Sequence, residues 1–229
     1  MIKRLYVLLL VLSAFGISSC SDSDEPSGEI AIAGLDYFPT DSGLTRIYQV
    51  DSAYWDDFTG SSGIISYQIR EVQAGTFTDL QGRPAIRIER FRSDSLGNWI
   101  IDRVWSAVRT NQRAEVTEEN NRIIKLVFPP ELESSWNGNA YNTLAEETYR
   151  YIRFGADTAA GQTFPETATV LQGDEQGNLI ELRYGSEKYA RNTGRIYKKR
   201  VDLEFTLPMP NRDTVAGFIY TEKLLSVQR

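Results

Sequence analysis

The chain has 229 residues, a formal net charge of −6, one cysteine and no histidine. Nucleic-acid binding requires clustered Lys and Arg, so the acidic balance of the chain argues against nucleic acid as a partner. Without histidine it cannot build a Ser-His-Asp or Cys-His catalytic site or a usual zinc site, so we expect no cofactor and no metal.

The first twenty residues, MIKRLYVLLLVLSAFGISSC, have the layout of an export signal. Lys3 and Arg4 come first, residues 5–17 are almost wholly apolar, and two serines follow. This order of positive, apolar and small residues is typical of a secretory signal peptide. The apolar core of about 13 residues falls short of the roughly 20 that a membrane-spanning helix needs.

Residues 17–20, Ile-Ser-Ser-Cys, resemble the lipobox of bacterial lipoproteins, in which an apolar and two small residues precede a cysteine. The resemblance implies diacylglyceryl transfer to the Cys20 thiol, cleavage before Cys20 and acylation of the new amino group. Stable anchoring takes more than one acyl chain, each buried methylene contributing about 0.8 kcal/mol. An ordinary signal peptide with a chance cysteine is the alternative. An acylated Cys20 leaves no thiol for a disulfide or for catalysis.

Residues 21–28, SDSDEPSG, are small and acidic and have the composition of a solvated tether. An acidic cluster after a lipobox cysteine also resembles the surface-export signal of Bacteroidota-type lipoproteins. That resemblance implies display on the outer leaflet of the outer membrane, and a flexible spacer on a periplasm-facing lipoprotein is the alternative. Loss of Lys3 and Arg4 on cleavage would change the formal charge from −6 to −8.

The predicted organisation has three parts. A signal peptide occupies residues 1–19, the lipidated Cys20 and the tether occupy 20–35, and one domain occupies 36–229. The mature length suffices for one sizeable core, and no change in composition marks a boundary within the domain.

Alternation of apolar and polar residues predicts about ten strands in this domain. We place polar breaks at residues 56–63, 73–82 and 115–121, irregular structure at 136–139, and a short helical turn at 187–190. The pattern predicts an all-β fold with one antiparallel, strongly curved sheet, which is half-barrel, barrel or sandwich-like. The predicted strands are 44–54, 65–70, 85–92, 99–108, 123–128, 148–154, 167–172, 179–184, 196–205 and 218–227.

Three segments resemble small lipoproteins of Bacteroidota-type bacteria, in the family's order. Residues 36–52, 136–142 and 187–199 match the family's YYPL..G..W.Y.V.S, WNGNAYN and E.YA.GVG.IYKE segments. Thr45 or Arg46 stands where the family has an aromatic residue, and Thr193 replaces a small apolar one. The resemblance implies an all-β fold with a strongly curved antiparallel sheet, similar to the half-barrels of lipoprotein carriers. It supplies no catalytic residues.

Two aspartate-glycine-asparagine runs share one spacing, Asp94 with Gly97-Asn98 and Asp174 with Gly177-Asn178. Asp opens turns by bonding its own backbone, while Gly and Asn tolerate positive φ, so each run predicts a hairpin turn. A calcium loop, the alternative, requires several more oxygens at alternating positions.

Residues 54–58, YWDDF, combine aromatic rings with carboxylates, a mixture that suits sugar binding. The alternative is a strand end whose aromatics complete the core and whose acids face water. Trp99 and Trp105 share a strand parity, and we expect both to pack inward. Residues 198–200, Lys-Lys-Arg, alternate along a strand and predict a solvated face.

We expect a membrane-anchored, non-enzymatic outer-membrane lipoprotein whose β-domain binds a glycan, a lipid or an envelope protein. A structural or assembly component without a small ligand is the first alternative, and a large exposed apolar patch would favour it. A carboxylate-dependent glycoside hydrolase is the second. It would need two carboxylates roughly 5 to 9.5 Å apart in a cleft. The candidate carboxylates for that chemistry are Glu131, Glu133, Glu146 and Glu147.

Overall fold

A computed structural model describes residues 33–173, 177–206 and 213–229. The chain divides into two units, residues 1–31 and 32–229, and every described residue belongs to the second. Cys20, the acidic tether and Asp174 lie outside the described residues. No helix in the described ranges has both the length and the apolar character needed to cross a bilayer.

The described residues form one short 3₁₀ helix and twelve strands. The bounds are η1 Leu35–Tyr37, β1 Thr45–Asp56, β2 Ser61–Thr78, β3 Pro84–Ser93, β4 Trp99–Arg109, β5 Arg113–Glu118, β6 Asn121–Val127, β7 Ser135–Asn137, β8 Thr148–Ala159, β9 Gln162–Gly173, β10 Glu181–Ala190, β11 Gly194–Phe205 and β12 Thr214–Gln228.

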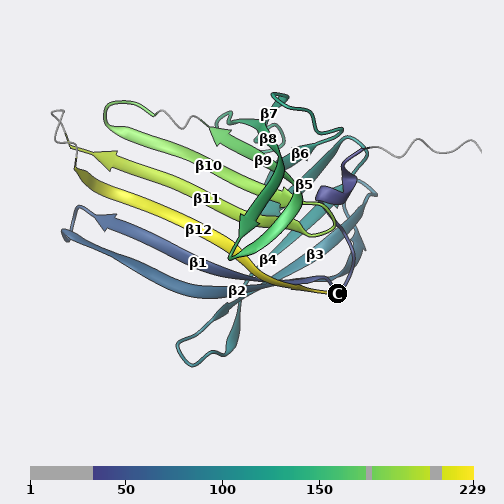
Figure 1. The fold of residues 1–229 in the computed structure, drawn as a ribbon, viewed down its shortest axis with the longest axis horizontal. Coiled ribbons are helices and arrows are strands. Elements are labelled where there is room, and N and C mark those ends of the chain that lie inside the picture. The colour runs from purple at the N-terminus through teal and green to yellow at the C-terminus, as the bar shows by residue number, and fades with distance from the viewer. Residues whose placement is uncertain (1–32, 174–176, 207–212) are drawn as a thin grey trace, which may run out of the picture. The chain divides into compact units, whose positions relative to one another are not determined.

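All twelve strands belong to a single sheet whose paired neighbours are antiparallel (Figure 1). The strand order is β6-β5-β4-β3-β2-β1-β12-β11-β10-β9-β8-β7, so the first and last strands of the chain are hydrogen-bonded neighbours at its centre. The predicted fold class, one antiparallel and strongly curved sheet, is confirmed, with twelve strands in the described residues in place of about ten.

The additional strands are β5 and β7. The predicted break at 115–121 is wrong, because β5 runs through Arg113–Glu118 and only a tight turn at Glu119 and Asn120, both with positive φ, separates it from β6. A helical turn at 187–190 is also wrong, since these residues pair with β9 and β11 inside β10.

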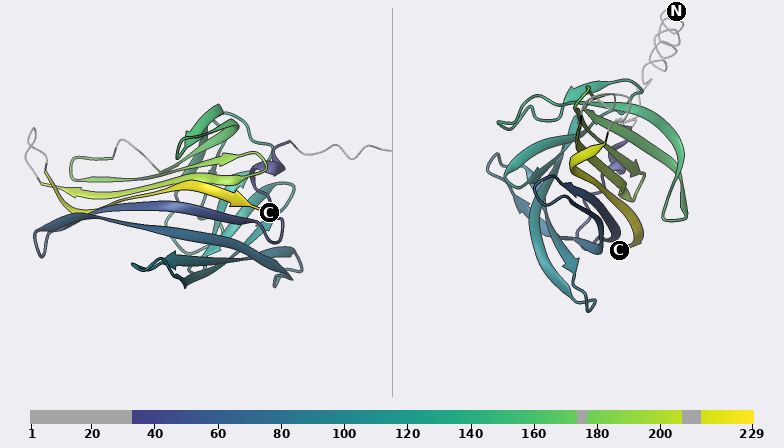
Figure 2. Two further views of the ribbon diagram at one scale, coloured as in Figure 1. Left: turned by 60° about the horizontal axis from the view of Figure 1, so that its bottom comes forward. Right: turned by 90° about the vertical axis from the view of Figure 1, so that its left-hand side faces the viewer.

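The sheet curls until its two outermost strands meet (Figure 2). The amide N–H of Ile124 in β6 donates to the Gly138 carbonyl, just after β7, at 2.9 Å. The indole N–H of Trp136 in turn donates a 2.9 Å hydrogen bond to the Ile124 carbonyl. A Cβ at Gly138 would lie 2.7 Å from the Tyr149 ring, so only glycine permits this close approach. These contacts nearly close the sheet around an interior.

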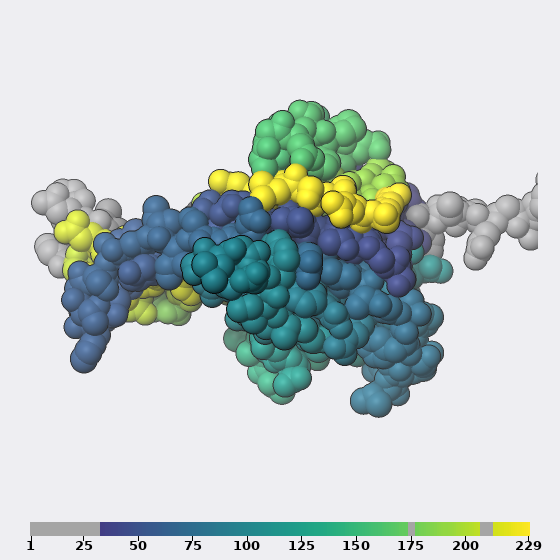
Figure 3. All heavy atoms as spheres, turned by 90° about the horizontal axis from the view of Figure 1, so that it is seen from below, coloured from purple at the N-terminus to yellow at the C-terminus, as the bar shows by residue number. Residues whose placement is uncertain are grey.

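The segment that includes η1 packs across one end of the curl. Tyr37 is buried in the core cluster, and Phe38 packs against it. Arg109 of β4 donates to the carbonyls of Leu35 and Phe38 at 3.1 and 2.9 Å. At the other end, β1, β2 and β10–β12 continue beyond the curl as a long ribbon (Figure 1), which projects from the body in the space-filling view (Figure 3).

Candidate functional site

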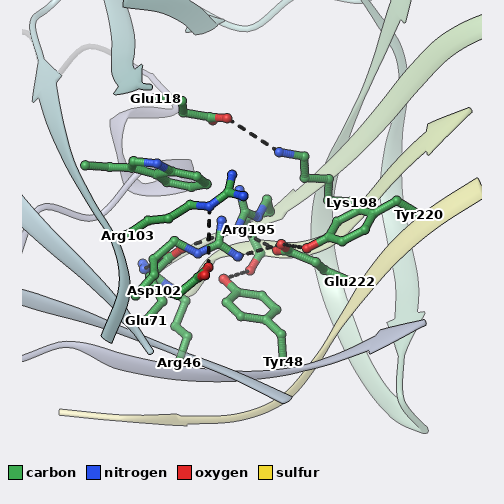
Figure 4. A network of polar contacts seen from close by, with 12 residues as sticks. Arg46, Tyr48, Glu71, Asp102, Arg103, Glu118, Arg195, Lys198, Tyr220 and Glu222 are labelled. Atoms are coloured by element: carbon green, nitrogen blue, oxygen red, sulfur yellow. Dashed lines mark hydrogen bonds and ion pairs between the residues drawn. The ribbon is translucent and has the colours of Figure 1, made fainter. Parts of the chain in front are cut away.

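Charged side chains, rather than apolar ones alone, fill the middle of the curled sheet. They come from eight strands. Figure 4 labels Arg46, Glu71, Glu118, Arg195, Lys198 and Glu222, whose side chains point toward one another across the interior. We call this set the interior network: Arg46 (β1), Glu71 (β2), Arg90 (β3), Glu118 (β5), Lys125 (β6), Glu187 (β10), Arg195 and Lys198 (β11), and Glu222 (β12).

Two carboxylates organise the arginine half of the network. Glu222 accepts hydrogen bonds from Arg90 at 2.5 Å and from Arg195 at 2.8 Å, and also from the Tyr220 hydroxyl. Glu71 lies 3.4 Å from Arg46 and 3.2 Å from the same Arg195 nitrogen. Arg195 therefore links the two carboxylates.

The lysine half lies between β5, β6, β10 and β11. Lys125 Nζ is 2.8 Å from Glu118 and 3.2 Å from Glu187. Lys198 Nζ faces the same two carboxylates at the longer distances of 3.6 and 3.9 Å. The Tyr189 hydroxyl donates to Glu187. Lys198 is the more loosely held of the two lysines.

Trp105 of β4 packs against both halves. The Arg90 guanidinium lies 4.1 Å from its ring centroid, and Lys198 Nζ lies 5.8 Å away. The indole N–H donates to Glu119 at 3.2 Å. An aromatic face is attractive to cations, so Trp105 stabilises charges that burial would otherwise destabilise.

Ion pairing sets the charge states of most of this network. Burial alone would raise the pKa of Glu222, but Arg90 and Arg195 outweigh it and hold the pKa below its usual range. Burial would lower the pKa of Lys125, but Glu118 and Glu187 raise it. Lys198 is different, because burial lowers its pKa, and its neighbouring carboxylates do not fully oppose this.

A small cavity of about 40 Å³ lies in the interior beside the network. A space of this size holds a few water-sized particles at most, since one water needs about 10–15 Å³. It is far smaller than the roughly 300 Å³ of an ordinary ligand pocket. Its walls include Phe38, Gln73, Trp105, Val116 and Tyr189, together with the network residues Arg46, Glu71, Lys125 and Arg195.

A different feature lies on the outside, along β4. This strand pairs with β3 along most of its length, but with β5 only at residues 106–109. On the side away from β3, residues 99–105 have no neighbouring strand among the described residues. Ile100, Ile101 and Val104 on this stretch are exposed. We call residues 99–105 the free edge of β4.

Two open hollows flank the free edge. One, of about 720 Å³, is lined by Phe77, Arg87, Arg103, Trp105 and Glu119, among others. The second, of about 420 Å³, lies farther along the same strand, and its walls include Tyr67, Arg92, Ile100, Ile101 and Asp102. Both combine apolar, aromatic and charged side chains.

The predicted inward packing of both Trp99 and Trp105 is wrong for Trp99. Trp105 faces the interior, whereas Trp99 packs on the other face beside Arg70, whose guanidinium lies 5.1 Å from its ring. The cause is a β-bulge, since Arg90 pairs with Arg103 but Phe91 pairs with Ile101. The extra residue, Asp102, reverses the parity of the strand.

The aromatic and acidic segment 54–58 forms the end of β1 and the turn that follows it. The Asp56 carboxylate accepts hydrogen bonds from the N–H groups of Phe58 and Thr59 at 3.0 and 3.3 Å. Phe58 is 94% exposed, so the expectation that these aromatics complete the core is wrong for Phe58. The Asp56 carboxylate therefore stabilises the turn.

The hairpin turn predicted at Asp94 is confirmed. Its carboxylate accepts from the N–H groups of Leu96 and Asn98 at 2.9 and 2.8 Å, between the paired ends of β3 and β4. In the second turn, the Asn178 side-chain oxygen accepts from the N–H groups of Ile180 and Glu181.

Two of the candidate glycosidase carboxylates form ion pairs with arginines. Glu133 pairs with Arg150, and Glu147 pairs with Arg200, each at 2.8 Å. The solvated face predicted at 198–200 is wrong for Lys198, which belongs to the interior network.

Sequence reasoning missed most of the interior network. The sequence did contain a usable signal. Arg90 alternates in step with the buried Ile86 and Ile88, and Glu71 alternates in step with the buried Ile69. A charged residue at an inward position of an apolar alternation indicates a buried ion pair.

No model of a known protein family matches the chain, and the comparison with curated proteins gives no match. Crystal structures that are similar to it include the following two. One is described as an exported protein with a YmcC-like fold from Bacteroides fragilis. It is 9% identical, with a TM-score of 0.49, over 84% of this chain and 98% of its own.

The second is described as a lipoprotein from Parabacteroides distasonis. It is 11% identical, with a TM-score of 0.46, over 84% of this chain and 98% of its own. Neither likeness assigns a function to this chain, and the resemblance of the three sequence segments to one lipoprotein family stays a prediction.

Proposed function

We propose that this chain is a lipid-anchored, non-enzymatic protein of the outer membrane that binds an extended segment of another envelope protein along the free edge of β4. The observation that carries the proposal is the run of residues 99–105, which lacks a neighbouring strand among the described residues and lies between two hollows.

A strand edge of this kind presents N–H and C=O groups in a row, ready to pair with another extended chain. Main-chain hydrogen bonds then supply affinity, and pockets for alternate side chains supply specificity. The free edge meets both requirements, because Arg103 and Trp105 line one hollow while Ile100 and Ile101 line the other. An exposed apolar edge is also an aggregation hazard unless something covers it.

The other expected ligands have less support. A lipid would need an apolar space, whereas the interior of the sheet holds nine charged side chains and a cavity of about 40 Å³. A glycan would need a free aromatic face, and the Trp105 ring beside the larger hollow packs on Arg90, with its N–H already bonded to Glu119. A polypeptide strand requires neither feature.

The location rests on the sequence. Residues 17–20 supply the acylation motif at Cys20, and the acidic residues that follow favour display on the outer leaflet. In the native host, a fatty-acid analogue should label the wild-type chain and leave Cys20→Ser unlabelled. Persistent labelling of Cys20→Ser would contradict the anchor.

The same cells test the binding edge. A photoreactive side chain placed at Val104 should crosslink to one envelope protein, and mass spectrometry should locate the link in an extended segment of it. Lys223 is the matched control, because it is also exposed but its strand is paired on both sides.

A second change separates strand addition from a general surface contact. Ile101→Lys places a charge on the free edge, which opposes strand pairing. It should abolish the crosslink from position 104 while leaving fatty-acid labelling intact. Equal crosslinks from 104 and 223, or a crosslink that survives Ile101→Lys, would contradict the proposal.

A further inference from the structure

The small interior cavity has an unusual charge balance on its walls. Three cationic side chains line it, those of Arg46, Lys125 and Arg195, against the single carboxylate of Glu71. The side chains of Arg46 and Lys125 are 5% and 3% exposed, and that of Arg195 is 10% exposed. Solvent therefore does little to screen the excess of positive charge.

The surplus extends to the whole interior network. Within the described residues, its five cations face four carboxylates, which leaves one positive charge unbalanced. The tyrosine hydroxyls that contact it remain neutral, because burial raises the pKa of Tyr48 and of Tyr189. An uncompensated charge inside a protein is strongly unfavourable, so a counter-charge or a proton loss is required.

Two polar atoms beside the cavity lack partners. Among the described residues, neither Arg195 Nε nor Gln73 Oε1 has a hydrogen bond, although both atoms are buried. Gln73 is held in place by its Nε2, which donates to the Pro39 carbonyl at 3.0 Å. Buried polar atoms without partners point to an occupant that the protein atoms do not supply.

We propose that this cavity binds one monovalent inorganic anion of the size of chloride, accompanied by a water. The anion accepts a hydrogen bond from the Nε–H of Arg195 and balances the surplus charge. The water donates a hydrogen bond to Gln73 Oε1. At about 40 Å³ the cavity has no room for a sugar or an acyl chain. The site is independent of partner binding at the free edge of β4.

Loss of the Lys198 proton is the competing way to remove the surplus charge. Lys198 does not line the cavity, so its substitution changes the charge of the network without reshaping the walls. Lys198→Met removes the surplus, and Lys198→Arg keeps it. This pair separates anion binding from simple filling of the cavity by water.

Thermal unfolding of the full chain in detergent gives the first test. At equal ionic strength and pH 7, we expect a higher Tm in sodium chloride than in sodium gluconate, whose anion is too large to enter. The difference should grow with chloride concentration and saturate, as ligand linkage requires. It should persist in Lys198→Arg and vanish in Lys198→Met.

Fluorescence gives a direct test, because the indole of Trp105 forms part of the wall. Bromide should quench a saturable component of the emission that Trp105→Phe lacks, and chloride should compete for it. In Lys198→Met the bromide dissociation constant should rise at least about tenfold, since unit charges interact strongly in a low-dielectric interior.

Other results would overturn the proposal. Equal Tm values in the two salts, with bromide quenching that never saturates, would show that the cavity holds water only. Saturable quenching of equal strength in Lys198→Met and in the wild type would show that the surplus charge does not drive binding.

Discussion

Glu222 accepts more than one charged hydrogen bond in the interior. Its carboxylate, 1% exposed, accepts from two guanidinium groups and from the Tyr220 hydroxyl. A buried ion pair is weak evidence of net stability, because desolvation offsets much of the attraction. Removal of one partner is a different matter, since it leaves charges buried without compensation. The network is therefore sensitive to the loss of any single member.

Glu222→Gln tests this dependence with little change in shape. It should lower the free energy of unfolding by about 3–5 kcal/mol, because Arg90 and Arg195 lose a charged acceptor in the interior. Glu133→Gln is the matched control, and its exposed pair with Arg150 should contribute at most about 1 kcal/mol. Urea unfolding measures both changes. Equal losses in the two variants would show that the buried ion pairs of Glu222 contribute no more to the free energy of unfolding than an exposed pair does.

At the scale of single strands, alternation predicts most of the sheet and fails where a strand departs from strict period two. The hairpin of β3 and β4 is predicted within a residue or two, because its polar turn lies between two apolar alternations. The faces of β4 are not predicted correctly, because the bulge at Asp102 puts Trp99 and Trp105 on opposite faces of the sheet. A bulge depends on pairing with the neighbouring strand, which one segment of sequence does not contain.

The alternation pattern fails to predict β5 for another reason. Glu115 lies in the middle of this strand, and its polar character reads as a loop. Its carboxylate is in fact buried and accepts from Arg113 and Arg122 at 2.5 and 2.6 Å, with Arg83 at 3.1 Å. Buried charges that are satisfied by ion pairs look like surface residues in the sequence, and the same is true of the candidate interior site.

Gly217 shows how closely the long strands approach each other. It has φ +114°, and a Cβ there would lie 2.0 Å from the Asp202 carbonyl oxygen of β11. Gly217→Ala should therefore cost at least about 2 kcal/mol, from backbone strain together with the clash. Gly75→Ala is the control, since it has open space around it, and its effect should stay within about 1 kcal/mol.

Guanidinium unfolding of both variants gives the comparison. A loss in Gly217→Ala no larger than that in Gly75→Ala would contradict the tight pairing of β11 with β12 at this point. Such a result would also mean that the backbone can leave the left-handed region at Gly217 without cost.

At the scale of the whole domain, closure of the curl brings together strands that are far apart in the chain. Arg90 and Glu222 are 132 residues apart, and each is ordinary within its own strand. Composition and alternation predict a curved sheet, but they do not say which inward residues meet. The interior network exists because the sheet nearly closes, and the sheet in turn encloses charges that must stay paired. Stability should therefore depend on pH at both extremes.

In acid, Glu118, Glu187 and Glu222 govern the response. Each has its pKa held below the ordinary 4.5 by neighbouring cations that outweigh the effect of burial. In the unfolded chain these groups take up protons near pH 4.5, whereas the folded state resists them. Stability is therefore complete above that value and falls as the pH drops below it, by about 1.4 kcal/mol per pH unit for each proton.

In alkali, the direction in which stability changes with pH is set by tyrosines whose pKa is raised by burial above the ordinary 10. The unfolded chain releases these protons above pH 10 and the folded chain keeps them, so stability falls as the pH rises further. Lys198, with its lowered pKa, acts in the opposite direction but is a single group. The tyrosines are Tyr37, Tyr48, Tyr149, Tyr151, Tyr189, Tyr197 and Tyr220.

Urea unfolding at a series of pH values from 2 to 12 should give a plateau between about pH 5 and 9.5 with a decline on both sides. Tyr48→Phe should make the alkaline decline shallower by about 1.4 kcal/mol per pH unit, the share of one proton, and leave the acid side unchanged. A free energy of unfolding that stays constant from pH 5 to pH 3 would mean that the carboxylates titrate alike in both states. The interior network would then not hold them as charged partners, and the closed, ion-paired interior described here would be wrong.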